Sequence, residues 1–176
     1  MNDLGFLGDL VKILIPAACV MYAMYLVVKS FLNKEFERKL VELKIKNTEI
    51  ILPLRLQAYE RMALFLERIS PSNLLLRTNQ PDYTAAHLQH LLIAAIREEF
   101  NHNLSQQVYI SEQTWKIIRL SMDTIITSIN NAYKSLPGEA RSIELAKKIM
   151  DERMQKNEDP VQAALFCLKT EIQKVF

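Results

Sequence analysis

Glu99 and His102 are the residues of this chain whose types and spacing best suit chemistry, because they form an E-x-x-H pattern. Di-iron carboxylate bundles take this pattern from each of two helices, with a further glutamate from each of two more. Here the pattern occurs once, and Glu60 and Glu67 are glutamates that a bundle would have to bring alongside it. A metal-binding helical-bundle enzyme centred on Glu99 and His102 is the alternative hypothesis. The favoured interpretation is structural, with Glu99 capping or pairing and His102 near a helix end.

The other reactive side chains are isolated along the chain. His87 and His90 are spaced as half of a zinc site, but no neighbouring cluster completes tetrahedral coordination, so a solvated polar face is expected. Cys167 lies in an apolar stripe and is expected to be a core residue rather than a nucleophile. Cys19 lies in a separate apolar run, so no disulfide framework is predicted.

Composition excludes several classes of binding protein. Of the three glycines, Gly5 and Gly8 lie near the start, so the rest of the chain has Gly138 alone. A phosphate-binding loop needs several glycines close together, so none is expected here. The only charged residues before position 33 are Lys12, Lys29, Asp3 and Asp9. Residues 33–176 therefore include 20 basic and 18 acidic residues, and they contain no block of like charge. We therefore expect no cofactor, no nucleotide and no nucleic acid. Scarce glycine and few alternating Val/Thr runs favour an all-α fold.

The run from Ile13 to Val28 has no charged side chain, and this run determines whether the start of the chain lies in lipid or in water. Extended to Leu10 and Leu32 it has 23 residues, or roughly 34 Å of helix, enough to cross a hydrocarbon core of about 30 Å. A cleavable signal peptide is the first competing interpretation, but it would begin with positive charge and end at small residues. A buried core helix is the second, but it would keep a polar stripe. An uncleaved transmembrane helix is predicted, with membrane lipid as its partner.

Basic residues predict the orientation of this span, because they are enriched on the cytoplasmic side. Before the run there is Lys12 beside two aspartates, whereas six basic residues follow within eighteen positions. These residues are Lys29, Lys34, Arg38, Lys39, Lys44 and Lys46. The expected topology places the N-terminus outside and the C-terminal domain in the cytoplasm.

Apolar residues after the span are spaced alternately by four and three positions, which is the pattern of a coiled-coil seam. The seam consists of Phe36, Leu40, Leu43, Asn47, Ile50 and Leu54. Asn47 occupies a position where a polar residue can set the register of two helices. The seam is shorter than the three to four heptads that a coiled coil requires. Two interpretations stay open: a stalk helix that packs on its own domain, or a self-association site formed by Phe36, Leu40, Leu43, Asn47 and Ile50.

The remaining residues predict helices with short connections. Pro53 is expected to disrupt or kink the helix that precedes it, and residues 70–73 are expected to form a turn. Further helices are expected at 53–69, from 84, at 111–136, at 139–155 and from 159. The helix at 111–136 carries the clearest apolar stripe, the helix at 139–155 is expected to bury Ile143, Ala146 and Met150, and the last helix is expected to bury residues from Val161 to Val175.

Two segments resemble a known family. They are LQAYERMALFLERISPSNLLLR at Leu56–Arg77 and EEFNHNLSQQVYISEQTW at Glu98–Trp115. Both are similar to an uncharacterised family of single-span membrane proteins from Bacteroidota, catalogued as a domain of unknown function. The resemblance implies a helical protein anchored in the bacterial inner membrane, and it implies no activity or site residue.

Together these observations predict an all-α protein with four regions: a short extracytoplasmic N-terminus (1–9), a transmembrane helix (10–32), an amphipathic stalk (33–52) and a cytoplasmic bundle of about four to five helices (53–176). The expected function is non-enzymatic. The protein is expected to act as an accessory or scaffold subunit of a membrane protein assembly, binding a protein partner or itself.

Overall fold

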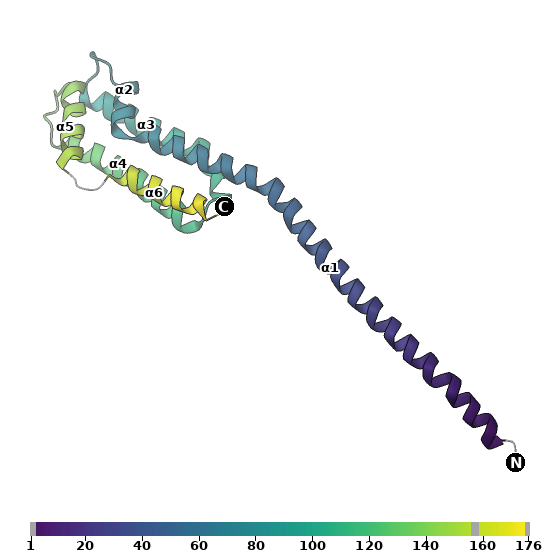
Figure 1. Ribbon diagram of the computed structural model, residues 1–176. Coiled ribbons are helices and arrows are strands. Elements are labelled where there is room, and N and C mark those ends of the chain that lie inside the picture. Colours follow the sequence, from purple (N-terminus) through teal and green to yellow (C-terminus); the bar gives the residue numbers. More distant parts are fainter. Residues whose placement is uncertain (1–2, 156–158, 175–176) are drawn as a thin grey trace. The chain divides into compact units, whose positions relative to one another are not determined.

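The structure of the protein is a computed structural model that describes residues 3–155 and 159–174. The described residues form helices and no β-strand, which confirms the all-α prediction (Figure 1). The elements are α1 (Asp3–Ile69), α2 (Pro71–Thr78), α3 (Ala85–Asn103), the 3₁₀ helix η1 (Leu104–Val108), α4 (Glu112–Lys134), α5 (Ser142–Gln155) and α6 (Pro160–Gln173). The chain divides into two compact units, Met1–Ile51 and Leu52–Phe176. The second unit is called the helical domain below.

Helix α1 continues through Pro53, so of the two outcomes predicted there, a disruption or a kink, the disruption is wrong. A proline inside a helix removes one backbone donor and clashes with the carbonyl four residues earlier, here that of Glu49. Its neighbours are mostly leucine, isoleucine, arginine and glutamine, of which several favour helix strongly. One lost hydrogen bond is therefore not enough to end a helix whose last turns are also held by the core.

The last turns of α1 form one wall of the helical-domain core. Tyr59, Met62, Leu66 and Ile69 are buried, and Phe65 is buried with them. The Phe65 ring lies 5.8 Å from the ring of Phe100 on α3, measured between centroids. Phe100 in turn stacks on Trp115 of α4 at 5.5 Å. Aromatic pairs at these separations add to the stability gained from burial, so three helices are joined at one point.

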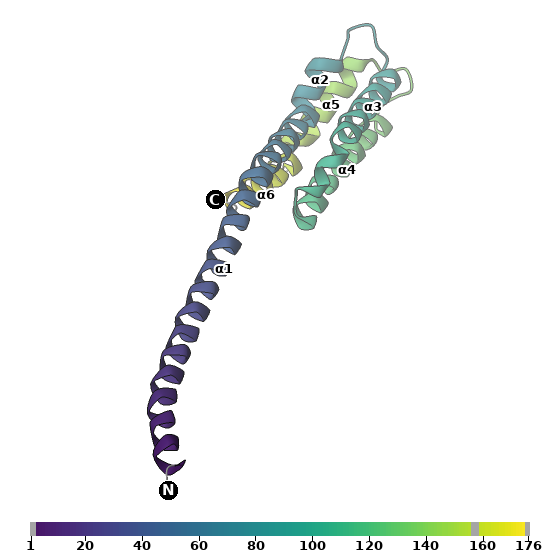
Figure 2. The ribbon, with the colours of Figure 1, turned by 90° about the vertical axis from the view of Figure 1, so that its right-hand side faces the viewer.

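Helices α4 and α6 contact each other extensively, and Figure 2 shows α4 also lying beside α3. The N-caps of both helices lie at the predicted starts, residues 111 and 159. The Ser111 hydroxyl accepts a hydrogen bond from the Thr114 amide, and the Asp159 carboxylate accepts one from the Val161 amide. The stripe of α4 is buried or partly buried as predicted, and α6 buries Val161, Ala164, Leu165 and Leu168. Val175 lies outside the described residues.

Helix α5 begins three residues later than predicted, and its buried face is rotated. The segment before it pairs with the segment before α3: the Ala85 amide donates to the Ala140 carbonyl, and the Ser142 amide donates to the Tyr83 carbonyl, both at 2.9 Å. These bonds hold residues 139–141 outside the helix. Ser142 is fully buried. The core residues of α5 are Leu145, Ala146 and Ile149, whereas Ile143 is 55 % exposed.

The turn predicted at residues 70–73 is instead the start of a short helix. Helix α1 ends at Ile69, Ser70 is the N-cap of α2, and Pro71 occupies the first turn of α2, where its missing amide hydrogen has no helical partner to lose. Leu74 and Leu75 of α2 are buried in the core. The prediction of a loop was wrong because Pro and Ser suit both a turn and the first turn of a helix.

Ser121 of α4 has a buried hydroxyl without a hydrogen-bond partner among the described residues. Its side chain is 2 % exposed, so water has little access to it. Burying an unpaired hydroxyl costs about 1–3 kcal/mol, and alanine has a higher helix propensity than serine. We therefore expect Ser121→Ala to raise the free energy of unfolding by about 1 kcal/mol in thermal or denaturant melts. Thr127→Ala, at an exposed position of the same helix, is the control and should change stability less.

Candidate functional site

The structure places Glu99 at an ion-pair cluster rather than at a cluster of metal ligands. Its Oε1 atom lies 2.6 Å from Nη2 of Arg68 at the end of α1 and 3.3 Å from Nη1 of Arg77 in α2. The Asn103 amide group donates to the Glu99 carbonyl at 2.8 Å and helps to end α3. His102 is exposed one turn further along. Glu99 thus links three helices through its carboxylate.

Two guanidinium groups at one carboxylate oppose the binding of a cation, because they would have to be displaced and would repel it. Glu60 and Glu67 do not join Glu99 and His102: within residues 3–155 and 159–174 no three His, Cys, Asp or Glu side chains gather as a metal site would need. The cluster borders an open recess of about 530 Å³ that is lined mainly by charged side chains. Its chemistry is that of a solvated ion-pair network.

The two other histidines and the two cysteines lie apart from Glu99 and from a common site. His87 and His90 are both exposed on α3. The His87 ring makes an edge contact with the ring of Tyr83, with centroids 4.5 Å apart. Cys167 is half-buried at a shallow recess between α4 and α6, so its predicted place in the core is only partly reached. Cys19 is exposed on α1.

A polar network that the sequence did not predict joins α1, α4 and α6. The Tyr59 hydroxyl donates to Glu171 Oε1 at 2.9 Å and accepts from Arg55 Nη2 at the same distance. The Ser111 amide and hydroxyl also donate to the Glu171 carboxylate, at 2.8 Å and 2.6 Å. Glu171 therefore accepts bonds from α1 and from the cap of α4 at once. No local pattern reveals this network, because Tyr59 and Glu171 are 112 positions apart.

The hydrogen bonds to Glu171 change its acidity. Burial of the carboxylate acts to raise its pKa, but the bonds from Ser111, Thr114 and Tyr59 outweigh burial and lower the pKa from its ordinary value of 4.5. Burial raises the pKa of Tyr59 above 10.0, and its bond to Glu171 adds to the rise. Near neutral pH both groups are therefore in the states that the network needs, an ionised carboxylate and a neutral phenol.

Glu171→Gln is expected to remove a pH-dependent part of the stability. A carboxylate whose pKa is lower in the folded than in the unfolded state stabilises the fold at pH values above its ordinary pKa of 4.5. This contribution is lost as the pH falls through the pKa of the folded state. The difference in unfolding free energy between wild type and variant should be about 1 kcal/mol at neutral pH, because the group is partly exposed, and should vanish in acid. Chemical denaturation at a series of pH values measures it. Glu139→Gln, in an exposed loop, is the control, and a difference that grew in acid would contradict the assignment.

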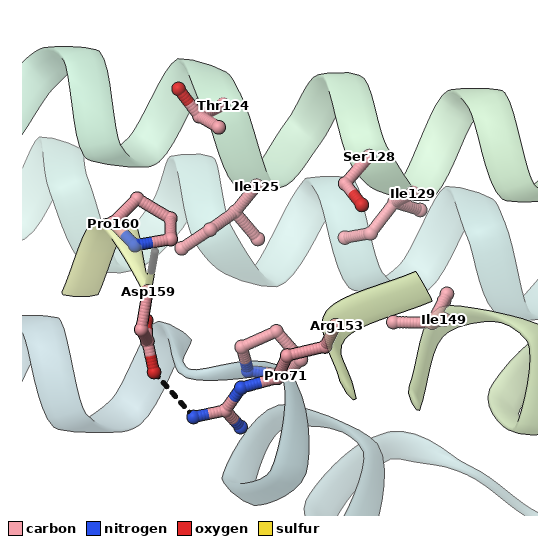
Figure 3. Close-up of a pocket in the computed structure, with 9 residues that line it drawn as sticks. All are labelled: Pro71, Thr124, Ile125, Ser128, Ile129, Ile149, Arg153, Asp159 and Pro160. Atoms are coloured by element: carbon pink, nitrogen blue, oxygen red, sulfur yellow. Dashed lines mark hydrogen bonds and ion pairs between the residues drawn. The ribbon is translucent and has the colours of Figure 1, made fainter. Parts of the chain in front are cut away.

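A small apolar cavity lies behind an ion pair at the meeting point of α2, α4, α5 and the start of α6 (Figure 3). Arg153 Nη2 contacts Asp159 Oδ2 at 2.6 Å, while Arg153 Nη1 donates to the Ser72 hydroxyl. The cavity volume is about 70 Å³. Ligand sites for drug-sized molecules measure about 300–1,000 Å³, so this cavity is a packing gap closed by a structural ion pair.

The side chains of residues 14–32, in the first part of α1, are all exposed in the part of the chain that the structure describes. By length and composition α1 can cross a membrane, and none of its most apolar 18-residue window is buried inside the protein. Val20, Met21 and Tyr22 are each at least 64 % exposed. At the end of the run the Lys29 ammonium lies 5.8 Å from the centre of the Tyr25 ring. A lysine and a tyrosine paired in this way are typical of the boundary between lipid and water.

The seam predicted after the span is also exposed on α1. Phe36, Leu40, Leu43 and Ile50 are between 45 % and 67 % exposed, and Asn47 is exposed among them. Lys46 pairs with Glu42 one turn away at 2.9 Å, and the Thr48 hydroxyl donates to the Lys44 carbonyl. These local contacts leave the apolar side chains uncovered.

Comparison with known proteins identifies a family but no function. No curated protein and no solved structure matches the chain. A family model described as a family of unknown function matches residues 6–175, which include α2 to α6 and nearly all of α1. The match covers both the apolar run and the helical domain, so the two parts occur together as one family unit. The chain belongs to this family of unknown function, DUF7935.

Proposed function

We propose that the protein is a non-enzymatic single-pass protein of the bacterial inner membrane. Its helical domain and stalk serve as an accessory or scaffold subunit of a membrane protein assembly. The observation that carries this proposal is the first part of α1, an apolar surface that is long enough to cross a membrane and is not covered by any residue that the structure describes. An apolar surface of this size is stable in lipid or against another protein, and not in water.

The proposed orientation places the N-terminus outside and the helical domain in the cytoplasm. Lys29, Lys34, Arg38 and Lys39 follow the span directly, and basic residues are retained on the cytoplasmic side. The Lys29–Tyr25 pair supports an end of the span near this point.

A binding role for the cytoplasmic part rests on the seam. Phe36, Leu43 and Ile50 expose apolar surface along one face of α1 just beyond the proposed span. Packing against another helix would remove this surface from water and stabilise the contact. The partner is either a second copy of the chain or another membrane protein.

The proposal is tested in intact cells with a photoreactive amino acid placed at Leu43 of the full-length protein. We expect alkaline carbonate to leave the protein in the membrane and irradiation to join it to a protein. The same reagent at Arg38, which lies away from the seam, is the matched control and should give little product. Release of the protein by carbonate would contradict the membrane assignment, and the absence of adducts from Leu43 would contradict the binding role.

A further inference from the structure

We infer that the seam binds a helix of another protein that carries carboxylates beside its apolar stripe, and not a second copy of this chain. This inference rests on the proposed function and names the partner chemistry of the same surface. It depends on the charged residues that flank Leu40, Leu43 and Asn47.

The proposed span restricts how two copies could meet. Chains that cross a membrane in the same direction present their seams in parallel, and each residue lies at the same depth in both copies. A copy would therefore place Asn47 opposite Asn47 and Leu43 opposite Leu43. Antiparallel or shifted pairings, which could relieve a charge conflict, would require a different membrane topology or depth.

In such a parallel pair, the residue before each "a" position contacts the residue after the next "d" position of the partner helix, and these flanking pairs set partner choice. In the seam, Leu40 and Asn47 occupy "a" positions, and Leu43 and Ile50 occupy "d" positions. Lys39 precedes Leu40 and Lys44 follows Leu43, so Lys39 of each copy would lie beside Lys44 of the other copy. Both pairs are repulsive. The next flanking residue, Lys46, would face an isoleucine of the copy, Ile51, and already pairs with Glu42 of its own helix.

Asn47 does not distinguish between the two kinds of partner. An amide both donates and accepts hydrogen bonds, so any polar residue at the same level satisfies it. The charges therefore decide. Lys39 and Lys44 lie on opposite flanks of the seam and are exposed, so a partner with aspartate or glutamate on both flanks turns each repulsive pair into an attractive one.

A charge-reversed version of the same protein is the probe. Full-length wild type is mixed with the Lys39→Glu, Lys44→Glu variant in neutral detergent micelles, and association is measured by fluorescence energy transfer between donor-labelled and acceptor-labelled chains. Each form repels itself at the flanking pairs and attracts the other form. We expect the mixture to associate about tenfold more tightly than wild type with itself at about 50 mM salt, and the advantage to shrink at about 500 mM.

Arg38→Glu is the matched control, because it reverses one charge on the face away from the seam and should not strengthen the mixture. The inference is overturned if wild type associates with itself as tightly as with the variant, or if no mixture associates. The proposed function fails separately, through carbonate release or the lack of any Leu43 adduct in cells. An adduct between two copies would overturn this inference and leave the proposed function in place.

Discussion

Ile118→Asp is expected to abolish the cooperative unfolding transition of the helical domain. The Ile118 side chain is fully buried on α4, the helix that contacts α3, α5 and α6. Losing its burial costs about 1.5–3 kcal/mol, and an unpaired carboxylate in the same place costs several kcal/mol more. A domain of this size is stable by about 5–15 kcal/mol in total, so the substitution removes most or all of that stability.

Leu120→Asp is the control for this change, since it introduces the same residue two positions away in the same helix at a side chain that is 66 % exposed. Circular dichroism during heating of the full-length protein in detergent separates the two variants. We expect a sharp transition for Leu120→Asp and a gradual loss of helix for Ile118→Asp. Equal melting of both variants would mean that α4 is not packed as described.

The combined change Val20→Asp and Met24→Asp is expected to prevent membrane insertion. Both side chains lie in the apolar run and are more than 65 % exposed. An aspartate near the centre of a membrane helix costs about 2.5–3.5 kcal/mol by insertion measurements, so two cost roughly 5–7 kcal/mol. The variant should leave the carbonate-resistant membrane fraction or be degraded.

Val41→Asp with Ile45→Asp is the matched control, because it places the same two residues at the same spacing in the stalk, where they would face water or headgroups. This control should remain in the membrane. Fractionation of cells that express each variant, followed by alkaline carbonate washing, measures the outcome. Retention of the Val20, Met24 variant in the membrane would show that the first part of α1 is held there by something other than lipid.

Several features of this protein could be predicted from the sequence because they depend on neighbouring residues. The apolar run of α1 is a matter of composition. Ser111 and Asp159 begin α4 and α6 because each is followed by a helix-forming stretch whose free amides it can satisfy. The buried stripe of α4 could be predicted because its apolar residues recur with the period of a helix and so lie on one face.

The tertiary structure decided which polar residues lie inside. Thr114 and Ser121 are buried although they are polar, because other helices pack against α4, and the sequence of a helix does not encode which neighbours will cover it. The start of α5 is set by two hydrogen bonds with the start of α3: the Ser142 amide donates to the Tyr83 carbonyl, and the Ala140 carbonyl accepts from the Ala85 amide. Hydrogen bonding to a distant segment therefore overrode the local preference for an earlier start.

The same distinction separates Glu99 and Glu171. The sequence favoured Glu99 as a chemical group, because His102 follows it three residues later. No sequence pattern pointed to Glu171. In the folded protein Glu99 pairs with two arginines from α1 and α2, while Glu171 accepts hydrogen bonds from α1 and the start of α4. Local spacing is determined by the order of residues, whereas the partners of a carboxylate depend on which distant helices the core brings together, and only packing determines that.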